Sequence, residues 1–293
     1  MAEHKETTII ERIIACRFCG STDLSKSGWY KDNQYYVCNV CGRKSAEMDT
    51  YPRMKYSKDL IVRALTYYYN GMSGWNISRT FNDVKNVDVP QSTIWRWIIK
   101  YSEMVNEYVL SLKPSLSEVW VADETVVDIW GEQYWFWDII DTETRFLIAS
   151  HLSRTRTMKD AIELFSMAKQ RSKTRPEIII TDRLLLYPSA FNKVFYTQYK
   201  EDRVEHLTSM GFSSPVNTNL IERFHGTIKQ RYKVMRDLKD PYSASVVLDG
   251  FVTHYDFFLE HSYLDMTPAI SAGIGNDIQN WGDLIERSIG FIR

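Results

Sequence analysis

The alternation of apolar and polar positions predicts two neighbouring strands near the middle of the chain. Residues 119–128 and 134–141 are rich in β-branched and aromatic side chains, and Gly131 marks a turn between them, so an antiparallel hairpin is expected. Asp123 lies inside the first strand, where a carboxylate is disfavoured and needs a reason. Because strand side chains alternate between faces, Asp123 and Glu124 should point to opposite sides, and at most one of them should join a given site on the sheet.

The elements after the hairpin follow an α/β order. Residues 145–152 are predicted as a third strand after a turn at 141–144, and residues 158–168 carry apolar side chains at helical spacing. Pro176 leads into the continuous apolar run 177–182, as expected for a strand buried on both faces. Three antiparallel strands, a helix and a buried strand are the opening order of an RNase H-like fold, a mixed sheet flanked by helices. A further helix and a short strand pair are expected after this run.

The segment 51–110 is predicted to be helical. An apolar stripe begins at Leu60, Ser73 is a candidate N-cap for a second helix, and Pro90 opens a third. Such a set forms a helix-turn-helix domain, whose third helix would present polar side chains to the major groove: Gln91, Ser92, Thr93 and Arg96. A helical linker domain with a solvated polar face is the alternative interpretation.

The four cysteines of the chain form two C-x-x-C pairs, each followed by glycine: Cys16 and Cys19, then Cys38 and Cys41. Two such pairs can place four thiolates tetrahedrally around Zn²⁺. The pattern predicts a zinc ribbon with one structural Zn²⁺, since four protein ligands leave no open coordination position. Four structural cysteines without a metal are the alternative.

Charge is unevenly distributed along a chain whose formal net charge is only -1. Residues 1–115 and 218–239 are net basic, whereas residues 240–293 are net acidic. Local basic surface is what contact with phosphate requires, so the balanced total does not exclude nucleic acid. No apolar run approaches the roughly 20 residues of a membrane span, and no signal-type segment follows the first residues. We therefore expect a cytoplasmic protein, associated with the nucleoid when bound to DNA and with no membrane partner.

Two further acidic residues occupy the edges of predicted elements. Asp182 ends the buried strand, where open α/β sheets commonly bind ligands, although an N-cap is an equally common use of Asp. Glu222 can close a capping box with Asn219, or it can begin a functional helix face. The residues that recur on this face are Glu222, His225, Lys229 and Lys233. The carboxylate would suit a metal ion, and the basic side chains after it would suit contact with successive phosphates. A solvated charged face is the alternative.

Together these segments resemble the DDE-type insertion-sequence transposases of the integrase-like, RNase H-like superfamily. The resemblance covers nearly the whole chain and rests on Asp123-Glu124-Thr125, on Thr181-Asp182 with Tyr187, on Asn219-x-Ile221-Glu222-Arg223-x-His225 running into Lys229, and on the C-terminal segment 255–273. It implies a zinc ribbon at 1–50, a helix-turn-helix domain at 51–112, an RNase H-like DDE catalytic domain at 113–240, and a C-terminal helical extension at 241–293 packed on the catalytic domain.

The resemblance also implies a site and a function. Asp123, Asp182 and Glu222 would form the catalytic triad and hold two Mg²⁺ (or Mn²⁺) ions, while Lys229 would contact DNA, with Lys233 on the same helix face. The protein would bind the terminal inverted repeats of a mobile element and catalyse strand cleavage and transfer into target DNA, as a homodimer or larger assembly. Alternatives are a transposase-derived DNA-binding regulator without catalysis and an RNase H-like nuclease without site preference. ATP is not expected, because the chain has no G-x-x-x-x-G-K-[ST] phosphate loop.

Overall fold

The structure is a computed structural model that describes residues 15–30, 33–46, 50–52, 54–209, 217–235 and 238–291. The chain divides into two compact units: Val62–Ser288 form one, and the residues up to Ile61 form the other together with the chain end from Ile289. The helices expected to bind DNA therefore share a unit with the catalytic sheet. The domain boundaries after residues 50, 112 and 240 stay predictions.

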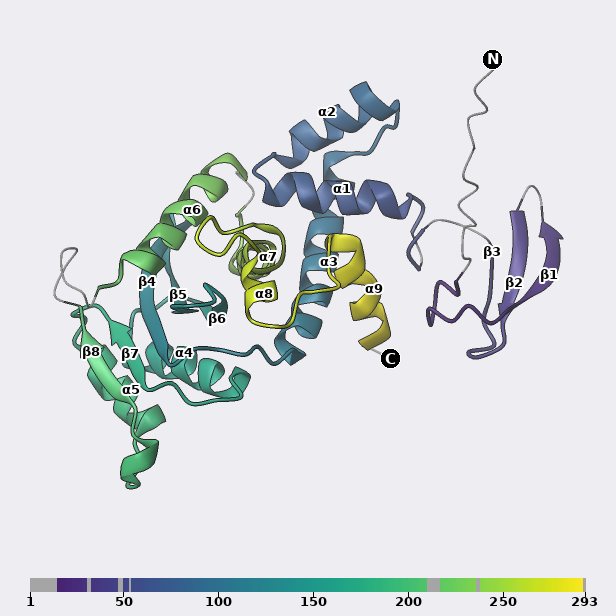
Figure 1. Ribbon diagram of the computed structural model, residues 1–293. Coiled ribbons are helices and arrows are strands. Elements are labelled where there is room, and N and C mark those ends of the chain that lie inside the picture. The colour runs from purple at the N-terminus through teal and green to yellow at the C-terminus, as the bar shows by residue number, and fades with distance from the viewer. Residues whose placement is uncertain are drawn as a thin grey trace, which may run out of the picture. The chain divides into compact units, whose positions relative to one another are not determined.

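A five-stranded mixed sheet forms the centre of the larger unit, in the order β6-β5-β4-β7-β8 (Figure 1). The predicted hairpin is present as antiparallel β4 (Val119–Ile129) and β5 (Glu132–Asp141), and β6 (Leu147–Ser153) adds antiparallel to β5. On the other side of β4, β7 (Ile178–Thr181) and β8 (Glu205–Thr208) pair in parallel. This strand order is that of the RNase H-like fold, so the predicted fold class is confirmed. Where a strand pair was expected after β7, the described residues contain the single strand β8.

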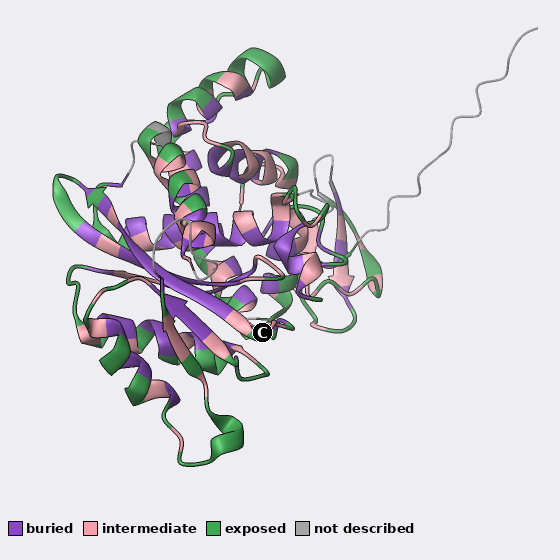
Figure 2. Cartoon of the chain, turned by 60° about the vertical axis from the view of Figure 1, so that its left-hand side comes forward, coloured by how far each residue is buried: buried purple, intermediate pink, exposed green. Residues whose placement is uncertain are grey.

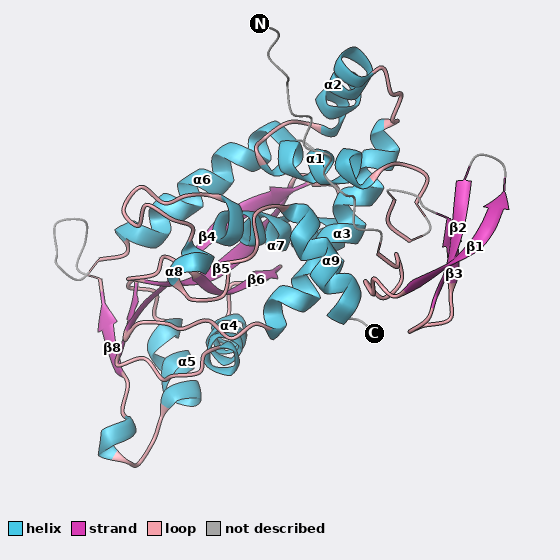
Figure 3. Ribbon diagram, turned by 45° about the vertical axis from the view of Figure 1, so that its right-hand side comes forward, coloured by secondary structure: helices cyan, strands magenta, loops and turns pink. Residues whose placement is uncertain are grey.

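Helices cover both faces of this sheet (Figures 1 and 3). One face carries α4 (Met158–Arg171) and α5 (Leu186–Phe195), and a 3-10 turn, η1 (Lys200–Asp202), precedes β8. The opposite face carries α6 (Asn219–Met235) and α7 (Pro241–Phe258), followed in the chain by α8 (Pro268–Ser271) and α9 (Trp281–Phe291). The strands are largely buried, whereas the outward surfaces of the helices are exposed (Figure 2).

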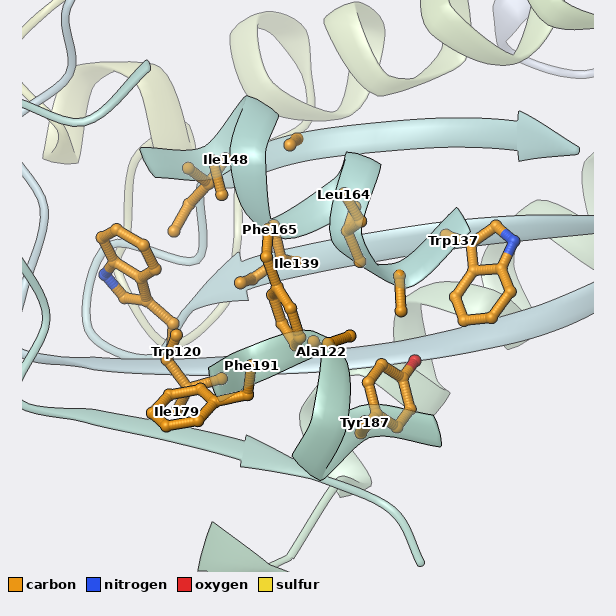
Figure 4. Packing of buried hydrophobic residues seen from close by; sticks show 14 of the residues in the cluster. Trp120, Ala122, Trp137, Ile139, Ile148, Leu164, Phe165, Ile179, Tyr187 and Phe191 are labelled. Atoms are coloured by element: carbon orange, nitrogen blue, oxygen red, sulfur yellow. The ribbon is translucent and has the colours of Figure 1, made fainter. Parts of the chain in front are cut away.

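The main core lies between the sheet and the α4–α5 layer (Figure 4). Every second residue of β4 and β5 faces it, including Trp120, Ala122 and Trp137, and these pack against Phe165 of α4 and Tyr187 of α5. Burial of each large apolar side chain contributes about 1.5–3 kcal/mol, so this face fixes the register of β4. The intervening residues of β4, Asp123 among them, consequently face the α6–α7 layer.

Three helices precede the sheet: α1 (Lys58–Tyr69), α2 (Gly74–Lys85) and α3 (Gln91–Ser111). The Ser73 side chain caps α2 by accepting from the Asn76 N–H, as predicted. Tyr69 anchors this group, because its hydroxyl lies 2.6 Å from the Ser102 hydroxyl of α3. A Cβ atom at Gly250 of α7 would lie 2.0 Å from the same hydroxyl, so α7 needs glycine at the point where it meets these helices.

The smaller unit contains an antiparallel sheet in the order β1-β2-β3, formed by β1 (Leu24–Tyr30), β2 (Asn33–Cys38) and β3 (Lys44–Ala46). β1 and β2 connect the two cysteine pairs, as expected for a ribbon, and β3 follows the second pair. Within the part of the chain that the structure describes, none of the helices combines the length and apolar character that a bilayer crossing requires.

Candidate active site

Asp123 and Asp182 come together at one end of the β4–β7 pair, together with Glu124. One carboxylate oxygen from each of the three lies within 4.8 Å of the others. The parallel pairing of β7 with β4 ends at Val121, so Asp123 lies just beyond the last residue of β7 that pairs with β4. Asp182 immediately follows β7. Two strands distant in sequence therefore deliver carboxylates to one place on the sheet.

The presence of Glu124 in this cluster corrects the expectation that only one of two adjacent strand residues could reach it. Glu124 does point toward the α4–α5 face, as alternation requires. Because β4 has no paired neighbour on its β7 side beyond Val121, the open edge lets the Glu124 carboxylate approach the two aspartates from the other face.

Glu124 is nevertheless fully engaged by protein groups. Nε of Arg156 donates to its Oε1 at 2.7 Å, and the second guanidinium nitrogen contacts the same oxygen. The buried Tyr187 hydroxyl donates to Oε2 at 2.5 Å. Burial, reinforced by the Glu124 charge, raises the pKa of Tyr187 well above its ordinary value, so this hydroxyl stays protonated as a donor. Both oxygens of Glu124 are thus held by Arg156 and Tyr187, and these contacts order this side of the site.

Asp123 faces α6 and contacts a histidine from that helix. His225 Nδ1 lies 3.7 Å from Oδ2 of Asp123, and His225 Nε2 lies 3.0 Å from Oδ2 of Asp138 on β5. Burial raises the pKa of Asp123 to about 7, the nearby His225 opposes the rise, and the charges of Glu124 and Asp182 add to it. A buried carboxylate beside two others favours a bound cation, because a cation relieves both desolvation and repulsion.

Asp182 is fixed by the turn that follows β7. Its Oδ1 accepts from the Leu184 backbone N–H at 2.9 Å. The N-cap residue of α5 is Leu185, so the alternative role of Asp182 as the cap of the next helix is wrong. The turn holds one oxygen of Asp182 and places the carboxylate within the cluster.

Glu222 lies in the first turn of α6 and outside the 4.8 Å cluster of described carboxylates. Its Oε1 accepts from the Thr218 hydroxyl at 2.8 Å. The helix begins at Asn219, so Asn219 is not an N-cap and the proposed Asn219 capping box is absent. Glu222 precedes His225 by about one helical turn. Because His225 contacts Asp123, the first turns of α6 lie against the same end of β4.

The residues predicted to contact DNA are placed on helix surfaces. In α3, Gln91, Ser92 and Arg96 are exposed and Thr93 is half-buried, whereas the predicted inward residues are buried: Ile94, Trp97 and Ile98. In α6, Lys229 is half-buried and Lys233 is exposed. The amphipathic character of both helices agrees with the prediction, and DNA contact by these side chains stays a prediction.

The four cysteines form a second cluster, in the smaller unit. One Sγ atom from each lies within 4.8 Å of the others, with 3.6 Å between Cys16 and Cys41 and 3.4 Å between Cys19 and Cys38. A tetrahedral site with Zn–S bonds of about 2.3 Å has sulfur atoms roughly 3.8 Å apart. The backbone N–H of Cys41 is the main cause that lowers the pKa of the Cys38 thiol, whereas burial and contact with the other three sulfur atoms raise that of Cys19.

Both cysteine pairs are closed by the same local turn. The N–H of Gly20 donates to the Cys16 carbonyl and that of Gly42 to the Cys38 carbonyl, each at 2.8 Å. Both glycines have positive φ, +72° and +69°, which a side chain would strain. The glycine after each C-x-x-C pair is therefore required by the turn, and the cluster is compatible with zinc.

Two residues of the site were not identified from the sequence. Asp138 and Arg156 contact His225 and Glu124 respectively. The signal for Asp138 was present, because it is a carboxylate inside an apolar strand, as Asp123 is. Arg156 lies in a loop before α4, and nothing in its sequence context points to Glu124.

Comparison with known proteins identifies the class. The fold and the carboxylate cluster define an RNase H-like enzyme, and residues 117–258 match the model of a family described as the DDE domain. This match and the relatives below support a DDE-type insertion-sequence transposase, a divalent-metal-dependent enzyme that acts on DNA in transposition and recombination.

Individual relatives support this assignment. The chain is 27% identical over 187 residues to the transposase for insertion sequence-like element IS431mec of Staphylococcus aureus (strain N315), covering 63% of this chain and 79% of the relative. The same values hold for the transposase for insertion sequence element IS257 in transposon Tn4003 of Staphylococcus aureus.

Similar solved structures include the HTLV-2 integrase catalytic core domain in complex with magnesium, in its trimeric form. Its TM-score is 0.43 at 15% identity, with 55% of this chain and 99% of that chain covered. The simian T-cell lymphotropic virus intasome in complex with PP2A regulatory subunit B56 gamma has a TM-score of 0.42 at 16% identity, with 58% and 59% covered.

Proposed function

We propose that this transposase binds the terminal inverted repeats of a mobile element, cleaves the DNA at those ends and transfers the freed strands into target DNA. The observation that carries the proposal is the convergence of Asp123 and Asp182 from β4 and β7, beside a helix with basic side chains. Relatives with the printed name of transposase and the DDE-domain match support it.

Asp123, Asp182 and Glu222 are proposed to hold the divalent metal, Mg²⁺ or Mn²⁺, as a pair of ions. The donor set fits, because hard divalent cations take oxygen ligands and carboxylates from separate elements suffice. When bound, such ions activate the attacking hydroxyl and stabilise the leaving oxygen in phosphodiester cleavage. To join the other two, Glu222 would exchange its hydrogen bond from the Thr218 hydroxyl for a place in the cluster.

The surrounding residues prepare the two aspartates. The Leu184 N–H orients Asp182, and His225 lies beside Asp123. Arg156 and Tyr187 keep Glu124 from competing as a ligand. Because these partners already contact the carboxylates without DNA, the carboxylates are oriented before DNA arrives.

DNA contact is proposed to divide between two helices. Gln91, Ser92, Thr93 and Arg96 of α3 would read base edges, while Lys229 and Lys233 of α6 would contact phosphates near the cleaved bond. The cysteine cluster is proposed to hold one structural Zn²⁺ that stabilises the ribbon. Two element ends must be brought together, so a homodimer or larger assembly is proposed for the active complex.

A strand-transfer assay with the full chain, Mg²⁺ and duplexes that carry the DNA flanking the gene tests this function. The Asp182→Ala variant should lose joining and cleavage but keep end binding, whereas Asp202→Asn, an exposed carboxylate of η1, should retain all three. Joining by Asp182→Ala would disprove the metal assignment. End binding without cleavage by the wild-type protein would favour a DNA-binding regulator instead.

A further inference from the structure

A single tryptophan occupies the tip of the β4–β5 hairpin. Trp130 and Gly131 form the two-residue loop between the paired residues Ile129 and Glu132, and their φ angles are +55° and +81°. Two positive φ values define a type I′ turn, which favours Asn-Gly because a bulky side chain is strained there. Trp130 is 71% exposed, so burial does not offset that strain. A large aromatic ring is thus presented to solvent at a position where the backbone disfavours it.

The ring lines one of two hollows that share Lys239 on the surface of the same compact unit. A cavity of about 430 Å³ is lined by Trp130 and its neighbours together with Lys239, and a cavity of about 350 Å³ is lined by Gln91, Ser92 and Trp95 of α3 together with Lys239. The Lys239 ammonium is 5.9 Å from the centroid of the Trp130 ring. Lys239 therefore connects the hairpin tip with the N-terminal end of the predicted recognition helix.

Acidic side chains in these hollows are already engaged by other groups. Glu132 forms an ion pair with Arg154 at 3.0 Å, and Asp240 accepts from the Ser243 N–H at 2.9 Å as the N-cap of α7. The ion pair with Arg154 offsets the charge of Glu132 beside Lys239, and the cap holds the Asp240 carboxylate against the α7 backbone. The local chemistry, an aromatic face next to a cation, is what proteins use to hold unpaired bases and the phosphates that link them.

The hairpin tip is also connected to the carboxylates. Helix α6 lies beside β4 (Figures 1 and 3), with His225 at Asp123. Further along the helix, burial and then the charge of Asp128 raise the pKa of Tyr232. The helix thus extends along β4 from the site toward the tip. Trp130 follows Asp123 by seven residues, about 23 Å along a strand, which is less than one turn of B-form DNA, about 34 Å. One DNA end can reach both.

We propose that Trp130 stacks on an unpaired base close to the DNA end that this enzyme cleaves, with Lys239 bound to the adjacent phosphate. The inference rests on the proposed function and adds a substrate contact to it. The DNA would be read by α3, opened at the hairpin tip and led along α6 to the aspartates. Stacking at the tip stabilises the separated strands and so favours entry of one strand into the site.

Binding of two labelled duplexes to the full-length protein tests the proposal. One duplex is fully paired, and the other carries a few terminal mismatches with 2-aminopurine among them. Wild-type protein should prefer the mismatched duplex and quench its 2-aminopurine. Trp130→Ala should lose the quenching and about tenfold of the affinity for the mismatched duplex, and Trp130→Phe should restore part of both. Tyr196→Ala, which removes another exposed aromatic ring, is the matched control and should behave as wild type.

A second variant separates binding from folding. Asn suits the turn better than Trp, so Trp130→Asn should melt at the same or a higher temperature than wild type and still lose the preference for mismatched ends. Lys239→Ala should weaken both duplexes alike and reduce the salt dependence of binding.

Equal binding and quenching by wild type and Trp130→Asn would overturn the proposal. So would a change in oligomeric state, measured by light scattering, that accounts for the lost binding, because the ring would then contact a second copy of the chain. If the wild-type protein fails to cleave DNA but the mismatched-end preference depends on Trp130, the proposed function fails while the contact stands.

Discussion

His225 of α6 is hydrogen-bonded to Asp138 of β5, with 3.0 Å between Nε2 and Oδ2. Asp138 is the cross-strand partner of Asp123 in the β4–β5 register, so the two carboxylates share one face of the sheet. Burial raises the pKa of both carboxylates, and the imidazole between them contacts each one. The same ring fixes the helix that carries Glu222 against the strand that carries Asp123.

The first prediction concerns this relationship. Asp138→Asn should raise the Mg²⁺ concentration needed for cleavage by roughly 10- to 100-fold, the usual effect of losing a group that orients a metal-site residue. DNA binding should be unchanged, because Asp138 is fully buried and cannot touch DNA. A Mg²⁺ titration of cleavage checks this, with circular dichroism to confirm folding. An unaltered Mg²⁺ requirement would mean that Asp138 only supports packing.

A second prediction separates the two adjacent carboxylates of β4. Asp123→Asn should abolish cleavage, whereas Glu124→Gln should keep the Mg²⁺ requirement of wild type and lose stability instead. The loss should be about 1–3 kcal/mol, because the buried Tyr187 hydroxyl and the Arg156 guanidinium would both keep their places with a weaker acceptor. Chemical denaturation and cleavage assays measure the two effects. If cleavage by Glu124→Gln needed more Mg²⁺ than cleavage by Asp123→Asn, Glu124 and not Asp123 would be the metal ligand.

The cysteine cluster gives a third prediction. Purified protein should contain about one zinc per chain, measured by atomic emission, and Cys38→Ser should lower this content and the binding of element ends. Trp130→Phe, in the other unit, serves as a control that should retain full zinc. Metal-free protein with wild-type end binding would contradict a zinc ribbon.

A fourth prediction concerns the pH dependence of stability. Burial would raise the pKa of Asp160, but hydrogen bonds from Thr157 and Thr155 outweigh it and hold the pKa below its usual value. A lowered folded-state pKa means that the carboxylate stabilises the fold above the unfolded value of about 3.9, and that this stabilisation is lost as pH falls through the folded pKa.

Asp160→Asn should therefore reduce the free energy of unfolding by about 1–2 kcal/mol at neutral pH. The difference from wild type should shrink below about pH 4. Glu163→Gln, an exposed change on the same helix, is the control and should have little effect at either pH. A difference that is constant across this range would show that the carboxylate charge is not responsible.

The fifth prediction distinguishes base reading from phosphate contact. Arg96→Ala in α3 should weaken binding to the preferred end sequence by about 1–3 kcal/mol and leave binding to other sequences unchanged. The preference for that sequence should therefore relax. Lys233→Ala in α6 should weaken binding to all sequences alike. It should also reduce the slope of the logarithm of the binding constant against the logarithm of salt concentration by about one. Competition assays with matched and scrambled duplexes separate the two. Equal effects of both variants on all sequences would remove the recognition role of α3.

Much of the architecture follows from local pattern. The β4–β5 hairpin, the helices α1 to α3 and the two Cys-x-x-Cys turns depend on residues close in sequence, so alternation, helical spacing and the glycines after each cysteine pair were sufficient to predict them. Asp123 was recognisable because a carboxylate within an apolar strand is costly. Asp138 obeys the same rule.

Long-range pairing decided the rest. The sequence determined that Asp123, Glu124 and Asp182 occupy strands or strand ends, but only the parallel pairing of β7 with β4 brings them within 4.8 Å, and only the early end of that pairing lets Glu124 reach the cluster. The hydrogen bond that holds Glu222 at Thr218, and the hydrogen bond from Arg156 to Glu124, depend on side-chain positions set by packing. Sequence periodicity specifies which face a residue occupies, whereas strand order and the ends of pairing specify which other residues it meets.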